Sequence, residues 1–197
     1  MKKIIFATHN VGKVREFAQM MGKYKVEVLS LLDINYEDEI SENGTTFEEN
    51  ALIKAREIAS QYKSIVVADD SGLEIDALHG APGVYSARYA GISRCDNANM
   101  EKVLEGLKDV PAKERTARFV CVLVLIDEKG EEVVVRGTCE GEIWHEKRGT
   151  SGFGYDPIFY LPELDKTMAE LSKDEKNALS HRGSAFKKIE LIIGDII

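Results

Sequence analysis

Two short apolar runs constrain the fold more than any other feature of the sequence. Ile4–Ala7 and Ile65–Ala68 are continuously apolar and rich in β-branched residues. Such runs are typical of strands that are buried on both faces, as in a parallel or mixed sheet. Directly after the first run, apolar residues recur at spacings of three and four from Val11 to Met21, which predicts a helix that stops near Gly22. Strand, short polar turn and helix together open an α/β unit.

The rest of the chain continues this mixture of helices and strands. Thr46 and Glu49 form a capping-box pattern that predicts a second helix reaching Tyr62, and residues 96–108 predict a third. Residues 116–126 and 132–144 predict two long strands joined near Gly130, and after residue 154 we expect helices, with a second capping box beginning at Ser172. Without repeats or linkers, the sequence predicts a single α/β domain over residues 1–197, with a central mixed sheet flanked by helices.

The composition argues against several classes of partner. A formal net charge of -8 and a pI near 5.2 oppose a broad basic face, so we expect no nucleic-acid polymer as a partner. The three cysteines lack C-x-x-C spacing, so neither a disulfide framework nor a zinc site is expected, and a reducing cytoplasm is the predicted location. Neither a signal-peptide core nor a stretch of transmembrane length is present in the sequence, so no membrane partner is expected.

The segment Thr8–Lys13 lies between the first predicted strand and the first predicted helix. A helix N-terminus presents unpaired amides and partial positive charge. Thr8, Asn10 and Lys13 add a hydroxyl, an amide and a cation that can face one polyphosphate, although the Walker A spacing is absent. In the alternative interpretation, Thr8 or Asn10 merely caps the helix.

An acidic pair, Asp69 and Asp70, follows the second apolar run, and Ser71-Gly72 and an alternating segment, Leu73–Leu78, come next. Ligand crevices form at strand ends in open α/β sheets, and carboxylates suit Mg²⁺. Adjacent residues of an extended chain point to opposite faces, so at most one aspartate faces a metal unless the chain turns there. The alternative is a polar turn held by an aspartate hydrogen bond.

Three further groups of residues could complete a nucleotide site. Within the acidic segment 37–49, most charges suit a solvated face, but Glu42 could ligate a metal and Lys54 on the following helix could contact phosphate. The stretch 152–157 combines glycines with two aromatics, which fits either a nucleobase platform or a tight turn whose aromatics fill the core. Lys176 and His181 would lie about 140° apart on an unbroken helix, so they converge only if the helix breaks near Ser180.

Together these segments resemble the inosine triphosphate pyrophosphatase family, also called HAM1-like or noncanonical purine triphosphate pyrophosphatases. The resemblance spans nearly the entire chain, and several blocks in the right order are more specific than any one of them. The motifs that carry it are Thr8-x-Asn10-x-x-Lys13, Glu42-x-Gly44-x-Thr46-Phe47-x-Glu49-Asn50-Ala51, Ala68-Asp69-Asp70-Ser71-Gly72-Leu73, the segment Gly80–Arg88, the segment Gly152–Phe159, and Ser180-His181-Arg182.

The resemblance implies an activity and a role for each motif. The implied activity is Mg²⁺-dependent hydrolysis of ITP, dITP and XTP to the monophosphate and pyrophosphate, which keeps these nucleotides out of nucleic acids. It also implies a homodimer of elongated subunits with a central substrate cleft. Glu42 and Asp70 would hold Mg²⁺, with Asp70 as the proton acceptor, while Lys54 would contact phosphate and Ser71 the substrate. The triphosphate would be bound by Thr8, His9, Asn10, Val11, Gly12 and Lys13, and the purine by Phe153, Gly154, Tyr155, Asp156, Lys176, His181 and Arg182. His9 and Ser151 stand where relatives often have glycine, which affects only local backbone detail.

Hydrogen-bond counting explains how such a site would choose its base. Hypoxanthine and xanthine carry an oxygen at position 6 to which Arg182 or Lys176 can donate, whereas adenine presents an amino group there. Rejection of guanine needs a second feature that the sequence does not reveal. A Maf-like pyrophosphatase of pyrimidine or modified nucleotides and a non-hydrolysing nucleotide sensor are the competing hypotheses. The acidic pair with Glu42 disfavours the sensor, because uncompensated carboxylates repel phosphate.

Overall fold

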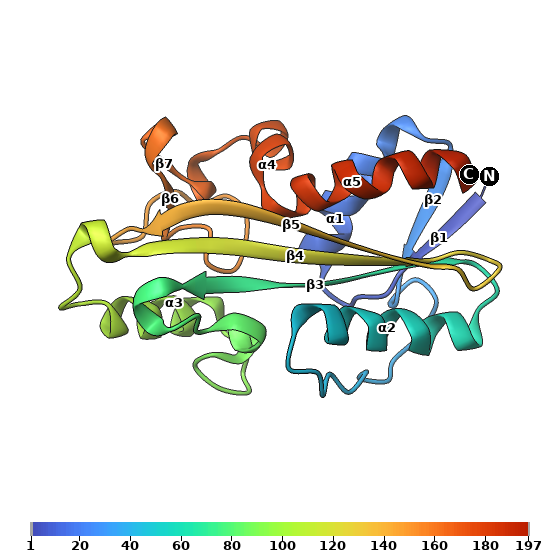
Figure 1. The fold of residues 1–197 in the computed structure, drawn as a ribbon, viewed down its shortest axis with the longest axis horizontal. Coiled ribbons are helices and arrows are strands. Elements are labelled where there is room, and N and C mark those ends of the chain that lie inside the picture. The colour runs from blue at the N-terminus through green and yellow to red at the C-terminus, as the bar shows by residue number, and fades with distance from the viewer. Residues whose placement is uncertain (1, 197) are drawn as a thin grey trace. The chain divides into compact units, whose positions relative to one another are not determined.

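The chain forms an α/β fold around a seven-stranded mixed sheet, seen in a computed structural model that describes residues 2–196 (Figure 1). The strand order is β2-β1-β3-β4-β5-β6-β7. The strands are β1 (Lys2–Phe6), β2 (Val26–Ser30), β3 (Ile65–Ile75), β4 (Thr116–Ile126), β5 (Glu132–Ile143), β6 (Phe159–Leu161) and β7 (Lys166–Thr167). The α-helices are α1 (Val11–Met20), α2 (Phe47–Gln61), α3 (Asp96–Gly106), α4 (Lys173–Leu179) and α5 (His181–Ile196). The predicted fold class is confirmed.

The chain divides into two compact units. The first unit contains the described residues of Met1–Asp70, Cys121–Gly137 and Arg182–Ile197, and the second contains Ser71–Val120 and Thr138–His181. That residues 1–197 form one pyrophosphatase domain with a central substrate cleft stays a prediction. No helix within residues 2–196 has both the length and the apolar character needed to cross a membrane.

The core of the first unit forms on both faces of parallel strands. β1 pairs in parallel with β2 and with β3, as the two apolar runs predicted. On one face, Phe6 stacks on Phe17 of α1 with ring centroids 4.6 Å apart, and Phe17 meets Phe186 of α5 edge to face. Helix α2 covers the opposite face in Figure 1 and buries Ala51, Ala55 and Ile58 among other residues.

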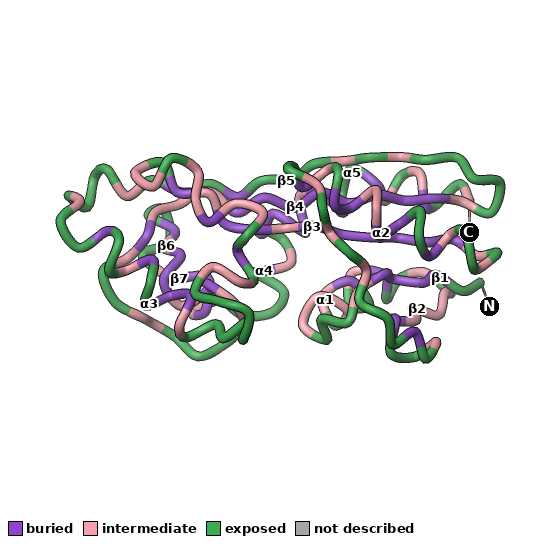
Figure 2. Tube along the Cα trace, turned by 90° about the horizontal axis from the view of Figure 1, so that it is seen from below, coloured by how far each residue is buried: buried purple, intermediate pink, exposed green. Residues whose placement is uncertain are grey.

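The second unit has its own hydrophobic core. Leu73 and Ile75 of β3 pack there with residues from helix α3 and strands β4 to β6. Tyr155 is buried in this core, and its hydroxyl donates to the carbonyl of Ser86 over 2.7 Å. Figure 2 shows that β3 and β4 are buried along most of their length, and the sequence of β4 is accordingly apolar from Phe119 to Ile126.

Local sequence signals located most elements correctly. Both capping boxes are present, at Thr46 before α2 and at Ser172 before α4. The expectation of helices directly after residue 154 was wrong, because β6 and β7 come first. These strands have only three and two residues, too short to show an alternating pattern. Strand β2 was not identified from the sequence either.

Candidate active site

Strand β3 runs without interruption through the acidic pair. The predicted strand end at Asp69 and Asp70 and the alternative of a polar turn there are both wrong, because β3 continues to Ile75 and includes the segment that was expected to be separate. The register of β1 and β3 covers only Ile65, Val66 and Val67. The acidic pair therefore lies in the middle of a strand, just beyond the point where the pairing with β1 stops.

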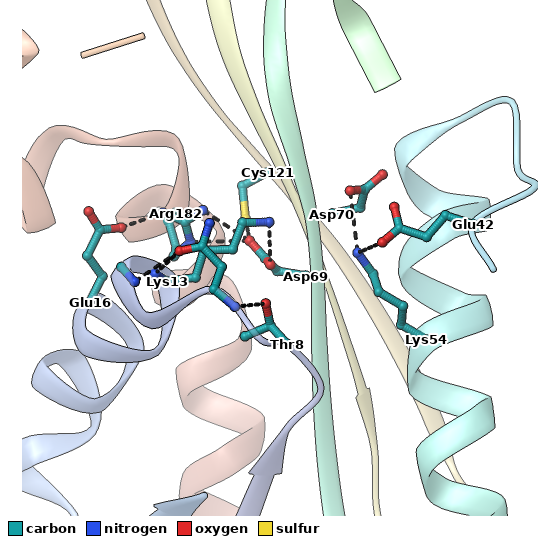
Figure 3. Close-up of polar contacts among 11 residues, drawn as sticks. Thr8, Lys13, Glu16, Glu42, Lys54, Asp69, Asp70, Cys121 and Arg182 are labelled. Atoms are coloured by element: carbon teal, nitrogen blue, oxygen red, sulfur yellow. Dashed lines mark hydrogen bonds and ion pairs between the residues drawn. The ribbon is translucent and has the colours of Figure 1, made fainter. Parts of the chain in front are cut away.

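The two aspartates point to opposite faces of β3, as the extended backbone predicted (Figure 3). Asp69 faces the side of α1 and α5, where Lys13 Nζ donates to its Oδ1 over 2.8 Å. Asp70 faces α2, where Lys54 Nζ lies 3.5 Å from its Oδ1. Consecutive residues thus belong to two different clusters of charge.

The first cluster surrounds Asp69 with cations. Arg182 is 1% exposed and donates from Nη2 to Asp69 Oδ2 over 3.1 Å, while its Nη1 donates to Glu16. The thiol of Cys121 also lies 3.9 Å from Asp69 Oδ2. Burial alone would raise the pKa of Asp69, but Lys13 and Arg182 outweigh that effect and hold the pKa well below its usual range. Asp69 is therefore an ionised partner for cations at neutral pH and a poor proton acceptor.

The second cluster leaves Asp70 incompletely satisfied. Asp70 is buried, and its Oδ2 has no hydrogen-bond partner among the described residues. Lys54 Nζ lies 3.2 Å from Glu42 Oε1, so one ammonium contacts both carboxylates. Burial raises the pKa of Asp70 above its usual value, and the neighbouring Glu42 and Asp69 add to this, although Lys54 and Lys13 oppose it. A carboxylate with a raised pKa is better suited to accept a proton near neutral pH.

The carboxylates of Glu42 and Asp70 suit a magnesium ion better than a metal that takes all of its ligands from the protein. Among residues 2–196, no group of three or more His, Cys, Asp and Glu side chains could hold a metal ion. Mg²⁺ often takes only one or two carboxylates and fills its remaining positions with water and phosphate oxygens. The unused Oδ2 of Asp70 is an oxygen of the required kind.

Asn50 fixes the segment that carries Glu42, and the sequence analysis did not identify this role. The amide of Gly44 donates to Asn50 Oδ1 over 2.8 Å, and Asn50 is 1% exposed in the first turns of α2. A Cβ at Gly44 would lie 2.6 Å from the same oxygen, so a side chain there would collide with it. The motif Glu49-Asn50-Ala51 was the available signal, since it places a polar residue on the buried face of α2 directly after the cap.

The segment Thr8–Lys13 caps α1 in the way that the alternative interpretation described. Asn10 Oδ1 accepts from the amides of Gly12 and Lys13 over 2.9 and 3.2 Å, and Thr8 Oγ1 accepts from Asn10 over 3.1 Å. His9 Nε2 lies 2.8 Å from the carbonyl of Tyr36, while Val11 is exposed. Capping is thus established for Asn10, and phosphate binding by this segment stays a prediction.

In the second unit, Lys176 and Asp156 fix the predicted base platform. Lys176 Nζ lies 2.6 Å from Asp156 Oδ2 and 4.6 Å from the centre of the Phe153 ring, and the amide of Phe153 donates to Asp156 over 2.9 Å. For Tyr155 the structure favours the alternative of an aromatic that fills the core, because the residue is buried there. Gly154 is held from outside the loop, because its amide donates to Asp96 over 2.8 Å.

The helix break expected near Ser180 is confirmed. Helix α4 ends at Leu179, Ser180 adopts an extended conformation, and α5 begins at His181. In the second unit, His181 is buried and stacks on Phe119 with centroids 4.8 Å apart. Ser71, which follows Asp70 in β3, is partly buried.

Arg182 has buried ionic partners that the sequence did not reveal, and its role in reading the purine stays a prediction. Its buried guanidinium belongs to the Asp69 cluster of the first unit, where it binds two carboxylates. The sequence grouped Arg182 with His181 because they are adjacent, yet the first turn of a helix directs neighbouring side chains to different sides.

Comparisons with known proteins identify relatives of this chain. The sequence model of the Ham1 family matches residues 4–191. A protein of Bacillus cereus named dITP/XTP pyrophosphatase is 54% identical over 96% of this chain and 94% of its own length. A protein of the same name from Bacillus subtilis is 52% identical over 98% of each chain.

Solved structures lead to the same family. The Ham1 protein of Staphylococcus aureus has a TM-score of 0.87 and 43% identity, covering 98% of this chain and 99% of its own. A HAM1 protein of Coxiella burnetii has a TM-score of 0.88 and 42% identity, covering 99% of this chain and 100% of its own. The sequence match and the shared fold together show that this chain belongs to the Ham1 family.

Proposed function

We propose that this chain is a magnesium-dependent pyrophosphatase of noncanonical purine nucleoside triphosphates, which hydrolyses ITP, dITP and XTP to the monophosphate and pyrophosphate. The observation that carries the proposal is Asp70, a buried carboxylate with a raised pKa and an unused oxygen, beside Lys54 and Glu42. Relatives named dITP/XTP pyrophosphatase at 52 and 54% identity support the substrate class. Such hydrolysis would keep these nucleotides out of nucleic acids.

Asp70 is the proposed proton acceptor for the attacking water. Its partner in sequence, Asp69, has a depressed pKa and is bonded to Lys13 and Arg182, so it is unsuited to this role. A protonated Asp70 keeps its proton more readily than an exposed aspartic acid would, since burial disfavours its charged form. Asp70 can thus take the proton from water at its carboxylate and release it after the reaction.

Lysines and carboxylates have complementary roles toward the triphosphate. Glu42 and Asp70 would hold Mg²⁺, which when bound supplies positive charge against the phosphate chain and lowers the pKa of bound water. Lys54 provides a cation in the same cluster, and Lys13 a second one at the start of α1. Because a nucleoside triphosphate carries close to four negative charges, water cannot attack until cations reduce that charge.

Residues of the second unit are proposed to recognise the purine base. Phe153 offers a ring face, and Lys176 is a buried cation held beside it by Asp156. A donor of this kind can bond the 6-oxygen of hypoxanthine or xanthine but leaves the amino group of adenine unmatched. Arg182, to which the family resemblance gives the same role, also pairs with Asp69 and Glu16.

We further propose that the protein is a cytoplasmic homodimer. The compartment is supported by Cys95, Cys121 and Cys139, all of which are free thiols. The dimer is carried over from the family resemblance alone. Size-exclusion chromatography with light scattering tests it, and a mass of one chain at micromolar concentration would contradict it.

A substrate panel tests the activity. ITP, XTP, GTP, ATP and dTTP are incubated with the protein and Mg²⁺, and the products are identified by phosphorus NMR. The proposal expects pyrophosphate from ITP and XTP, with Asp70→Asn as the inactive control. A preference for dTTP would favour the Maf-like alternative. Nucleotide binding without any phosphate product would favour the sensor.

A further inference from the structure

Lys54 separates the two carboxylates that are proposed to hold the metal ion. Its Nζ lies 3.2 Å from Glu42 Oε1 and 3.5 Å from Asp70 Oδ1, and the lysine is buried. Figure 3 shows the ammonium between the two carboxyl groups, reached from α2 on the same face of β3. The Lys54 ammonium therefore already lies between the two carboxylates, where a divalent cation would bind.

The charges of this cluster make a bare metal ion an unfavourable addition. Two carboxylates and one ammonium leave one negative charge, so the ammonium already offsets half of the attraction that a metal would otherwise feel. A divalent ion between Glu42 and Asp70 would also lie within a few ångströms of the Lys54 ammonium. In a buried site such like charges repel strongly, because little water screens them.

We infer that Lys54 keeps the metal position closed in the free protein and leaves it only when a polyphosphate offers the ammonium a new anionic partner. The inference rests on the proposed function, because it takes Glu42 and Asp70 as the metal ligands. It makes the metal enter together with the nucleotide. By linkage, metal and polyphosphate then strengthen each other's binding by the same factor.

A purely structural role for Lys54 makes the opposite prediction. If the lysine only held the two carboxylates in place for a metal, its removal would disorder them and weaken metal binding. If the lysine competes with the metal, its removal leaves two unneutralised carboxylates, and metal binding becomes tighter. The sign of the change in metal affinity therefore separates the two explanations.

The test is a calorimetric titration with Mn²⁺ alone, without any nucleotide, as a probe for Mg²⁺. Relative to the unmodified protein, Lys54→Met is expected to bind Mn²⁺ at least tenfold more tightly. The matched control is Lys63→Met, since Lys63 is an exposed lysine beyond the end of α2, and its metal affinity should stay unchanged. Adding Glu42→Gln to Lys54→Met should abolish the gain, which places the bound metal between these carboxylates.

A second variant keeps the test decisive if Lys54→Met does not fold. Lys54→Gln removes the charge but keeps an amide that can donate to both carboxylates, and circular dichroism verifies the fold of each variant. Unchanged or weaker Mn²⁺ binding in a folded, uncharged variant overturns the inference. The proposed function is judged separately by ITP hydrolysis in the unmodified protein, so one can fail while the other stands.

Discussion

Asp69 and Asp70 are consecutive residues of β3, yet their carboxylates lie on opposite faces of the strand and their pKa values shift in opposite directions. Asp69 is bonded to Lys13 and Arg182, whereas Asp70 keeps one buried oxygen without a described partner. Ionised Asp69 thus stabilises the folded protein, whereas ionised Asp70 is less favourable in the folded protein than in the unfolded chain. This contrast leads to a matched pair of substitutions.

Asp70→Asn is expected to keep or increase stability while it lowers turnover by about 10²–10⁴-fold, the usual contribution of a general base. The folded pKa of Asp70 is raised above 3.8, so its ionised form is less favourable in the folded protein than in the unfolded chain. Stability from this group is therefore greatest below pH 3.8 and falls as the pH rises through the folded pKa. Thermal unfolding and ITP turnover at pH 7 check both parts. A less stable variant with near-normal turnover would contradict the assignment.

Asp69→Asn is expected to destabilise the protein by about 3–5 kcal/mol, because it leaves Lys13 and Arg182 without a buried counter-charge. The folded pKa of Asp69 is depressed, so its stabilising effect is present above pH 3.8 and is lost as the pH falls toward the folded pKa. Urea unfolding at pH 7 and at a pH below 3.8 provides the measurement, with a larger difference from the unmodified protein expected at pH 7. Equal stability of the two proteins at pH 7 would exclude a structural role for Asp69.

The pH dependence of the reaction should report the raised pKa of Asp70. A plot of kcat/KM against pH is expected to fall on its acidic side at a pH above 3.8, because Asp70 must be ionised to accept a proton. Glu42 contributes to raising this pKa, so Glu42→Gln should move the acidic limb to lower pH as well as reduce the rate. If the acidic limb stays at the same pH in Glu42→Gln, Glu42 does not raise the pKa of Asp70.

Sequence patterns predicted the parts of this site that depend on local structure. The capping boxes, the buried strands and the helix break at Ser180 follow from residues that are close in sequence, and the structure confirms them. The opposite directions of Asp69 and Asp70 also followed from strand geometry alone. What the sequence left open was which aspartate meets which cation, since Lys13, Lys54 and Arg182 come from three different helices.

Errors arose where tertiary contacts override a local signal. Ser71-Gly72 looked like a turn, but β3 continues because its backbone is bonded within the sheet on the way to Ile75. Tyr155 stands in a glycine-rich segment typical of a binding loop, yet its ring fills the core and its hydroxyl finds the Ser86 carbonyl. Neither the contact of Tyr155 with Ser86 nor the partners of Arg182 could be predicted from residues nearby in the sequence.

Lys176→Met is expected to lower the preference for ITP over ATP at least tenfold in kcat/KM, because it removes the buried donor that is proposed to bond the 6-oxygen. Its ion pair with Asp156 is also lost, so a decrease in thermal stability should accompany the change. Lys176→Arg keeps the charge and serves as the control for stability. Comparable losses of kcat/KM on ITP and on ATP would count against base reading by this lysine.

Gly152→Ala tests whether Asp156 fixes the loop that carries Phe153. Gly152 has φ +80°, and an added Cβ would lie 1.9 Å from Asp156 Oδ2, the atom that accepts from Phe153 and pairs with Lys176. Gly80 has a similar φ of +86° but no atom within 4 Å of such a Cβ, so Gly80→Ala carries only the backbone strain of about 1–2 kcal/mol. Gly152→Ala should therefore be less stable than Gly80→Ala by a further ~1–3 kcal/mol, the usual range for overpacking. The free energy of unfolding in urea measures both. If the two variants are equally stable, the Asp156 carboxylate can move freely, and it is not the anchor of this loop.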